Sequence, residues 1–168
     1  MTLLKYCGLV HTMLVELHCH TNASDGLEPV GTLLKKAATC VGGIAITDHN
    51  TMAGYRKAVA LKSDLVIIPA IEISSQEGHI LAFGVHQEIR PGLSVPETID
   101  AIHDQSGIAV AAHPFGNFLR LGVRQLGHLE LFDAVEAVNG MCLPYQNTKA
   151  QREAARLKKP MIAGSDAH

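Results

Sequence analysis

Short apolar runs alternate along this 168-residue chain with segments whose apolar residues recur every three or four positions. Runs rich in Val, Ile and Ala are typical of buried strands, whereas the second spacing places one apolar stripe along a helix. Regular alternation of the two indicates an α/β fold. The seven predicted strands span residues 13–17, 44–47, 65–73, 79–85, 107–112, 134–138 and 160–163.

The helical segments lie between these strands and carry recognisable start and stop signals. Glu28-Pro29 opens the first helix because proline is favoured in a first turn, and Gly42-Gly43 follows its end. Val30 and Leu34 lie on its apolar face, one helical turn apart. The predicted helices span residues 28–40, 52–62, 96–105 and 146–157, and residues 116–131 are expected to form loop and helix without a clear pattern.

One connection is too short for a crossover helix. Residues 74–78, Ser-Ser-Gln-Glu-Gly, separate two predicted strands, which therefore should pair in the antiparallel sense. This pairing would bring Glu72, near the end of one strand, beside His79, at the start of the next.

Composition is typical of one globular domain. Hydrophobic residues make up 47% of the chain and charged residues 18%, which argues against long disordered segments. We expect residues 13–168 to form the domain and residues 1–12 to be an extension outside the core, with Met13 as a potential start. The net charge of −2 provides no basic surface for sequence-specific nucleic-acid binding.

The cysteines and apolar runs bear on localisation. Four scattered cysteines without a Cys-x-x-Cys pair suggest buried thiols in a reducing cytoplasm rather than a disulfide framework. No apolar run approaches the roughly 20 residues of a membrane span, and the N-terminus lacks the features of a signal peptide. We therefore expect a cytoplasmic protein without a membrane partner.

The first candidate site follows the first strand. His18 and His20 flank Cys19, and side chains two positions apart on a strand point to the same face. Two imidazoles form half of a metal shell, to which Asp25 could add an oxygen from the next loop. The pair alone is equally consistent with two structural histidines.

Later strand ends supply further potential ligands. In a parallel barrel the active site lies at the carboxyl ends of the strands, where the loops converge. A chance distribution would also place histidines elsewhere, as His11, His86, His103 and His128 are placed. The nine candidates at strand ends, or in the loops beside them, are His18, His20, Asp25, His49, Glu72, His79, His113, Asp166 and His168.

This ligand set favours a centre of two or three divalent ions. Nitrogen and oxygen ligands without thiolate suit zinc, manganese or iron, and about three protein ligands serve each catalytic metal. Three such ions would outweigh the three carboxylates and attract an anion such as a phosphate ester. In a two-metal scheme a bridging hydroxide attacks the phosphorus in line, without a protein nucleophile.

These motifs resemble those of the PHP (polymerase and histidinol phosphatase) family of metal-dependent phosphoesterases. The resemblance covers residues 13–168 and implies a distorted seven-stranded β/α barrel, TIM-barrel-like, with a metal site of two or three Zn, Mn or Fe ions at the strand C-terminal rim. It also implies that the nine candidates are the ligands. The matching motifs are His18-Cys19-His20 with Thr21, Ser24, Asp25 and Gly26; Thr47-Asp48-His49; Glu72 with His79; His113-Pro114; and Gly164-Ser165-Asp166-Ala167-His168.

Two departures from the family bear on the site and its substrate. Relatives of this size usually continue beyond the final Asp-x-His, so we expect a further C-terminal segment or another chain to cover the edge at His168. Attached polymerase domains and the insertions of histidinol-phosphate enzymes are lacking, which leaves the substrate open between a small phosphomonoester and a nucleotide or oligonucleotide phosphate. Arg120 and Arg124 are candidates for contacting it, or are surface arginines.

Other assignments stay open at this point. Asp48 and Asn139 could orient ligands or cap their loops. The alternative to a phosphoesterase is a non-catalytic metal-binding module that stabilises a partner protein. A hydrolase of C–N or C–O bonds would need fewer ligands, and serine hydrolysis is disfavoured because Gly-x-Ser-x-Gly is absent.

Overall fold

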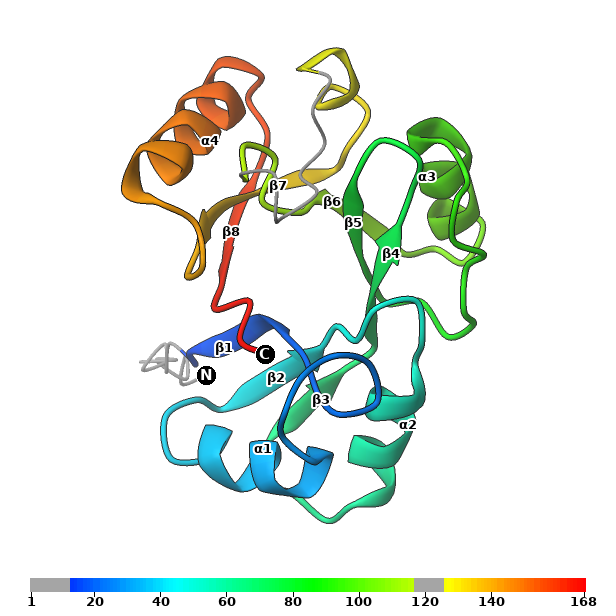
Figure 1. The fold of residues 1–168 in the computed structure, drawn as a ribbon, viewed down its shortest axis with the longest axis vertical. Helices are drawn as coiled ribbons and strands as arrows, with labels where there is room; N and C mark the ends of the chain where they lie inside the picture. Colours follow the sequence, from blue (N-terminus) through cyan, green and yellow to red (C-terminus); the bar gives the residue numbers. More distant parts are fainter. Residues whose placement is uncertain (1–12, 117–125) are drawn as a thin grey trace, which may run out of the picture.

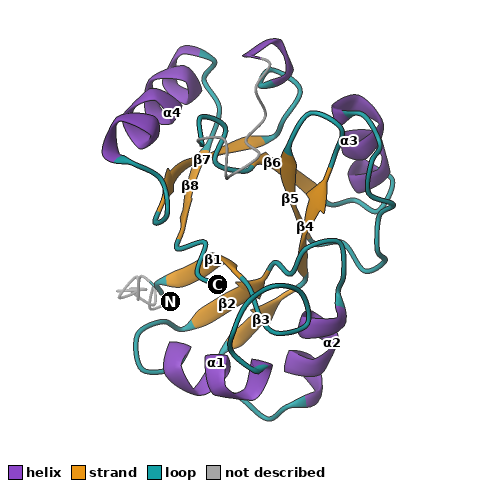
Figure 2. Ribbon diagram, in the orientation of Figure 1, coloured by secondary structure: helices purple, strands orange, loops and turns teal. Residues whose placement is uncertain are grey.

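The computed structural model describes residues 13–116 and 126–168, in which strands lie inside and helices outside (Figures 1 and 2). In chain order the elements are β1 (Val15–Cys19), α1 (Val30–Ala37), β2 (Gly43–Ile46), α2 (Ala53–Ala60), β3 (Val66–Ile68), β4 (Ala70–Ser74), β5 (His79–Phe83), α3 (Val95–His103), β6 (Ile108–Ala111), the short 3₁₀ helix η1 (Leu126–His128), β7 (Ala134–Asn139), α4 (Pro144–Arg156) and β8 (Met161–Gly164).

The strands form two sheets, and the α/β prediction is confirmed. β1, β2 and β3 make a parallel three-stranded sheet. The second sheet has the order β4-β5-β6-β7-β8, in which β5 runs antiparallel to both neighbours and the other pairs are parallel. Isolated bridges join both edges of the five-stranded sheet to the other sheet, between Cys19 and Ala167 and between His49 and Glu72. The sheets therefore meet without forming one continuous ladder.

The predicted strand 65–73 is two strands, so the described residues contain eight strands and not seven. The break falls at Pro69, which has no backbone N–H to donate and cannot continue a ladder. Before it, β3 pairs with β2; after it, β4 pairs with β5 in the other sheet. Pro69 therefore marks the point at which the chain changes sheets.

The short connection between β4 and β5 is the predicted antiparallel turn. Ser75 N–H donates to Gly78 O at 2.9 Å, and Ser74 lies opposite His79 in the register. Glu72 and His79 consequently lie at the same end of the strand pair.

Two hydrophobic clusters fix the outer helices. Val30 and Leu34 of α1 and Ala58 of α2 pack with Ile44 and Ile46 of β2. A larger cluster packs α3 against β4, β5 and β6, and its buried side chains include Ile73, Ile80, Ile99, Ile102, Ala109 and Phe132. These clusters leave the carboxyl ends of the parallel strands free to carry polar side chains.

Helix α3 begins with a capping box. The Ser94 hydroxyl accepts from the Glu97 backbone N–H at 3.4 Å, and Glu97 Oε2 accepts from Ser94 N–H at 2.9 Å. Two backbone donors that the helix leaves unpaired are thereby satisfied.

Several sequence predictions concern other parts of the chain. Residues 1–12 lie outside the described residues. Among the helices of residues 13–116 and 126–168, none is long and apolar enough to cross a membrane. Cys19 is a buried free thiol as predicted, but Cys40 is exposed because it lies in the turn after α1, and Cys142 is half-buried.

Candidate metal centre

β1 delivers the first two histidines to the inside of the fold. Both imidazoles are buried, with ring centroids 5.3 Å apart. The Cys19 thiol points the other way and donates to Ala45 O at 3.4 Å. Burial raises the pKa of this thiol, with further contributions from Glu16 and Asp48, so it is inert at neutral pH.

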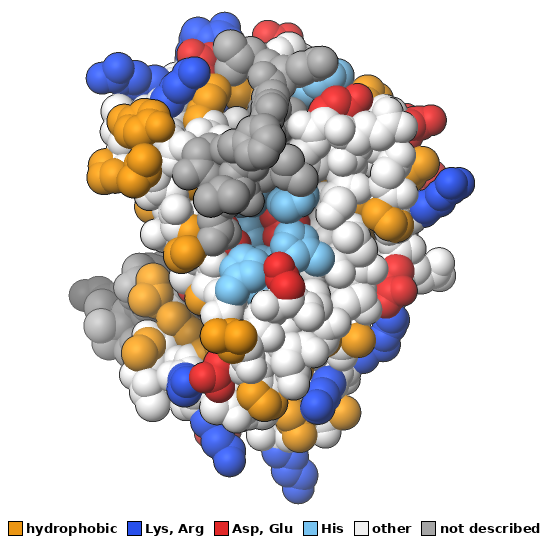
Figure 3. Space-filling model, in the orientation of Figure 1, with side chains coloured by type: hydrophobic (Ala, Val, Ile, Leu, Met, Phe, Trp, Pro, Cys, Tyr) orange, Lys and Arg blue, Asp and Glu red, His pale blue; other side chains and the backbone are white. Residues whose placement is uncertain are grey.

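The structure brings all nine predicted residues to one end of the strands. His49 follows β2, His113 follows β6, and Asp166 and His168 follow β8. In the space-filling view, histidine and acidic side chains gather in one hollow near the centre of this face (Figure 3). Residues from six strands or their ends, β1, β2, β4, β5, β6 and β8, thus share one site.

The Glu72 carboxylate is the centre of this arrangement. Its Oε2 lies 3.2 Å from His18 Nε2, 3.1 Å from His20 Nε2 and 3.5 Å from His49 Nδ1. Its Oε1 lies 3.2 Å from His79 Nδ1 and 3.1 Å from His113 Nε2. One buried carboxylate therefore faces five imidazoles, as a ligand shared between two metal ions would.

Three overlapping groups could each hold an ion, because their ligand atoms lie within 4.8 Å of one another. The inner group, His18, His20, Glu72 and Asp166, is buried. The outer group, His20, Asp25, His49 and His168, includes Asp25, whose side chain is 55% exposed. The outer group also contains His168, whose ring stacks on His20 with centroids 4.0 Å apart. The groups are His18, His20, Glu72 and Asp166; His20, Asp25, His49 and His168; and His49, Glu72 and His79.

The hydrogen bonding of the buried histidine ring nitrogens indicates whether these residues suit metal ions. Both ring nitrogens of His20, and Nδ1 of His49 and His113, are buried and lack a partner in hydrogen-bonding geometry, although His20 Nε2 and His49 Nδ1 lie 3.1 and 3.5 Å from Glu72 Oε2. A buried polar atom without a partner costs about 1–3 kcal/mol. Divalent cations beside these nitrogens would remove that penalty, so the donor set fits a metal centre.

The inner histidines are strongly basic in this environment. Burial lowers the pKa of His18, but the carboxylates of Glu72 and Glu136 outweigh it and raise the pKa well above its usual range. Burial likewise opposes the effect of Asp166 and Glu72 on His20, whose pKa is raised to about 9. Protons hold these positions in the metal-free protein, and bound cations would displace them.

The pKa values of the carboxylates Glu72 and Asp166 shift in the opposite direction, downward. Burial alone would raise the pKa of Glu72, yet His18 and the neighbouring imidazoles hold it well below its usual range. The same balance of burial against His20 lowers the pKa of Asp166. Glu72 and Asp166 are therefore ionised and available as ligands at neutral pH.

His49 differs from the inner histidines. Burial lowers the pKa of His49, and the attraction of Glu72 does not reverse that effect.

Asp48 anchors the loop between His20 and Asp25. Its Oδ1 accepts from Thr21 N–H at 2.7 Å and from the Ser24 hydroxyl at 2.9 Å, and its Oδ2 accepts from the Thr21 hydroxyl at 2.8 Å. Asp48 therefore holds the loop that joins two candidate ligands, His20 and Asp25, and these three hydrogen bonds do not cap its own loop.

Asn139 both orients a candidate ligand and caps its own loop. Its Nδ2 donates to Asp166 Oδ2 at 3.2 Å and to Glu136 Oε2 at 3.0 Å, while its Oδ1 accepts from Met141 N–H at 2.9 Å. Sequence reasoning missed Glu136, which lies 1% exposed in β7. The signal was a lone acid within the otherwise apolar run Ala134-Val135-Glu136-Ala137-Val138.

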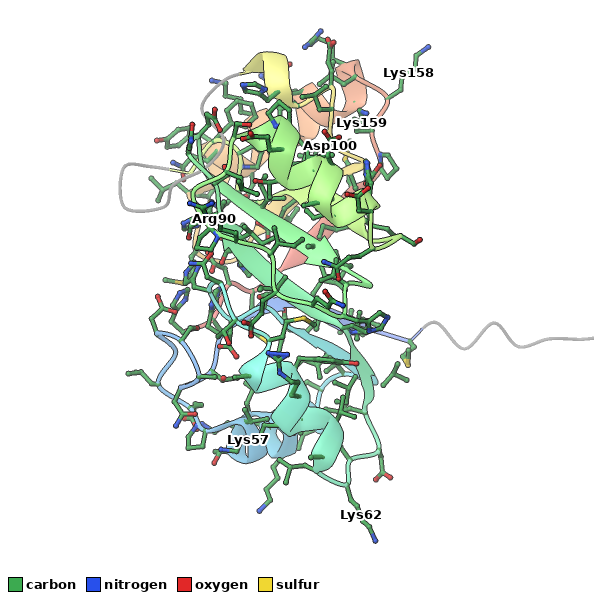
Figure 4. All side chains as sticks on the ribbon, turned by 90° about the vertical axis from the view of Figure 1, so that its right-hand side faces the viewer. Lys57, Lys62, Arg90, Asp100, Lys158 and Lys159 are labelled. Atoms are coloured by element: carbon green, nitrogen blue, oxygen red, sulfur yellow. The ribbon has the colours of Figure 1, made fainter. Side chains whose placement is uncertain are left out.

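The hollow is a cavity of about 260 Å³ whose described lining contains no Lys or Arg. Lys62 and Lys158 project from opposite ends of the molecule (Figure 4). Arg120 and Arg124, the candidate substrate contacts, lie outside the described residues. The lining residues all belong to the predicted nine: Asp25, His49, Glu72, His79, His113, Asp166 and His168.

A larger cavity, of about 620 Å³, opens at the other end of the strands. Its walls are mostly apolar, including Phe83 and Ile108, and its polar members are His103 and Asp133. These two residues pair with one another at 2.9 Å. The metal-ligating chemistry is thus concentrated at the carboxyl end of the parallel strands.

Comparison with known sequences relates the chain to one family. Residues 144–168 match the family described as PHP-associated. An uncharacterized protein of Methanocaldococcus jannaschii, MJ1587, is 32% identical over 141 residues, which cover 76% of this chain and 82% of that protein. The 5'-3' exoribonuclease Rnm of Salmonella typhimurium is 36% identical over 88 residues, 45% of this chain and 29% of the enzyme.

Solved structures share the fold at low sequence identity. A protein of Bifidobacterium adolescentis assigned to the metal-dependent phosphoesterases superposes with a TM-score of 0.77 at 20% identity, over 92% of this chain and 87% of that one. A two-domain protein of Bacteroides vulgatus, containing a predicted PHP-like metal-dependent phosphoesterase, gives 0.76 at 18% identity, over 93% of this chain and 52% of that one.

Proposed function

Because the chain belongs to the PHP family of metal-dependent phosphoesterases, we propose that it hydrolyses a phosphate ester at the site formed by its nine clustered ligands. The observation that carries the proposal is Glu72, a buried carboxylate facing five imidazoles at 3.1–3.5 Å. The described residues that line the cavity are histidines and carboxylates. Divalent cations bound among them would supply positive charge that attracts an anionic substrate.

Two or three ions of Zn, Mn or Fe would be held by the three overlapping groups, with His113 added through its contact with Glu72. Bound there, such ions activate water and neutralise negative charge on a phosphoryl group. The chain itself supplies the ligand geometry, the exclusion of bulk solvent around the inner group and, at Asp25, an exposed carboxylate on the outer side. The full ligand set is His18, His20, Asp25, His49, Glu72, His79, His113, Asp166 and His168.

The fold is part of the same proposal. We interpret the two sheets as a distorted β/α barrel, which is supported by the bridges that join both edges of the five-stranded sheet to the other sheet. In such a barrel the site lies at the carboxyl ends of the strands. The 5'-3' exoribonucleases among the relatives favour a nucleotide or oligonucleotide phosphate as the substrate, and a small phosphomonoester is the simpler alternative.

Hydrolysis of p-nitrophenyl phosphate and of a nucleoside bisphosphate, measured with and without chelator, tests the activity. Turnover should require added Zn, Mn or Fe and should fall about 100-fold or more in His20→Ala, which removes a ligand shared by two groups. The matched control is His86→Ala, which truncates an exposed histidine and should leave turnover unchanged. Activity that persists after complete metal removal would refute the proposal, and metal binding without turnover would favour the non-catalytic module.

A further inference from the structure

Glu136 is a buried acid of β7 that contacts the metal centre without belonging to any ligand group. Its Oε1 lies 2.8 Å from Nδ1 of His18. The other nitrogen of that ring, Nε2, faces Glu72 Oε2 at 3.2 Å and Asp166 Oδ1 at 3.3 Å. If Nδ1 carries the proton and donates it to Glu136, Nε2 is left with its lone pair directed at the proposed metal position.

The second carboxylate oxygen of Glu136 holds two further strand ends. Oε2 accepts from the backbone N–H of His113 at 2.7 Å. His113 has a φ of 28°, a strained value for a residue other than glycine, so this hydrogen bond restrains an unfavourable backbone. Oε2 also accepts from Asn139, which in turn donates to Asp166 Oδ2 at 3.2 Å.

Packing leaves the His18 and Glu136 pair little freedom to move. A Cβ on Gly164 would lie 2.3 Å from His18 Cβ and 3.0 Å from Glu136 Oε1. The glycine backbone therefore presses directly against the pair. An acid held so closely, with each oxygen committed to a different strand end, has few alternative partners.

We propose that Glu136 is a positioning residue that fixes the tautomer of His18 and the backbone of His113, and so sets the metal affinity of the centre. The inference rests on the proposed function for the identity of the ligands. Histidine ligands commonly donate their second N–H to a carboxylate, and loss of such a partner typically weakens metal binding 10–100-fold. One carboxylate thereby links a candidate ligand within β1 to candidate ligands that follow β6 and β8.

Glu136→Gln is the informative variant because it preserves shape and removes the charge. A glutamine amide accepts hydrogen bonds only through its oxygen. Its NH₂ group would therefore face either His18 Nδ1 or the backbone N–H of His113, and one of the two contacts of Glu136 would be lost. Zinc affinity, measured by competition with a chromophoric chelator, should fall about 10- to 100-fold. Circular dichroism and thermal unfolding report separately on the fold.

Asp133→Asn provides a matched control. Asp133 likewise accepts from an imidazole, His103 Nε2 at 2.9 Å, and from a backbone N–H, that of Ala109 at 2.7 Å, but at the other end of the strands. Its loss should leave zinc affinity within about twofold of the wild type. If Glu136→Gln binds zinc as tightly as Asp133→Asn does, the inference is overturned.

A second measurement needs no variant and covers the case in which Glu136→Gln does not fold. Histidine ¹⁵N spectra of the zinc-loaded wild-type protein should show His18 protonated at Nδ1, and the opposite tautomer would refute the inference. If the wild-type protein hydrolyses the phosphate ester with zinc, but Glu136→Gln binds zinc as tightly as the wild type, only the positioning role of Glu136 is contradicted. Weakened zinc binding without any phosphoester turnover would contradict the proposed function alone.

Discussion

Gly54, the second residue of α2, offers a quantitative test of how the helices support the metal centre. A Cβ at this position would lie 1.9 Å from Asp48 Oδ2, 2.9 Å from Ile46 Cγ2 and 3.0 Å from Thr21 Oγ1. Gly54→Ala should therefore displace the carboxylate that anchors the loop leading to Asp25.

Two opposing effects determine the size of the change. Alanine is favoured over glycine in a helix by about 0.5–1 kcal/mol. Against this, the Asp48 carboxylate would lose its three hydrogen bonds, which join it to Thr21 and Ser24. Hydrogen bonds to a charged group contribute about 1.5 kcal/mol each at the low end, or about 4–5 kcal/mol for three. The clash should win, with a net destabilisation of about 3–4 kcal/mol.

Urea unfolding of the metal-free proteins measures this difference. The matched control is Gly31→Ala, which changes the second residue of α1, a helix of the same length. A Cβ there would meet only Leu61 Cδ1 at 3.6 Å, an ordinary contact, so this variant should be about 0.5–1 kcal/mol more stable than the wild type. Equal stabilisation by both substitutions would show that Asp48 can move freely, and would refute the reasoning.

Three further predictions concern stability. Ser94→Ala should cost about 1 kcal/mol in urea unfolding because it removes one half of the capping box with Glu97. The pKa of Asp133 is lowered. Burial alone would raise it, but the hydrogen bonds from His103 and from the backbone N–H of Ala109 outweigh the effect of burial. Its stabilisation, about 0.5–1 kcal/mol for this half-exposed pair, is present above the unfolded pKa and disappears as the pH falls through the folded value. The wild type and Asp133→Asn should therefore differ in urea unfolding at pH 7 and converge once the pH has fallen below the lowered pKa of Asp133. A difference that grows on acidification would contradict this sign. Zinc at 100 times its dissociation constant should raise the free energy of unfolding by about 2.7 kcal/mol, and chelator should reverse the effect; an unchanged transition would count against a preformed site.

The element pattern could be predicted well because it depends on local spacing. The apolar stripe of α1, the antiparallel turn after Ser74 and the α/β alternation all follow from periodicities of two and three to four residues. The predicted strand 65–73 failed for a tertiary reason. Its apolar residues continue through Pro69, and only the partners of β3 and β4 reveal that the two halves belong to different sheets.

The residues of the candidate site also fall into those that the sequence predicts and those that only tertiary contacts reveal. His18-Cys19-His20 and the later motifs are recognisable in the sequence because each lies at a strand end. Glu136 is not, because its role depends on a 2.8 Å contact with a residue 118 positions earlier. A lone acid in an apolar strand indicates that some partner exists, but the sequence does not indicate which.

The sequence by itself determined which residues could bind metal and at which ends of the strands they lie, since strand direction and the identity of a side chain are local properties. Only the tertiary structure decided that Glu72 faces five imidazoles, that Asp25 lies at the open side, and that Glu136 supports His18 from behind. The physical reason is that these contacts require sheets built from distant segments to meet at their edges, which no local pattern encodes.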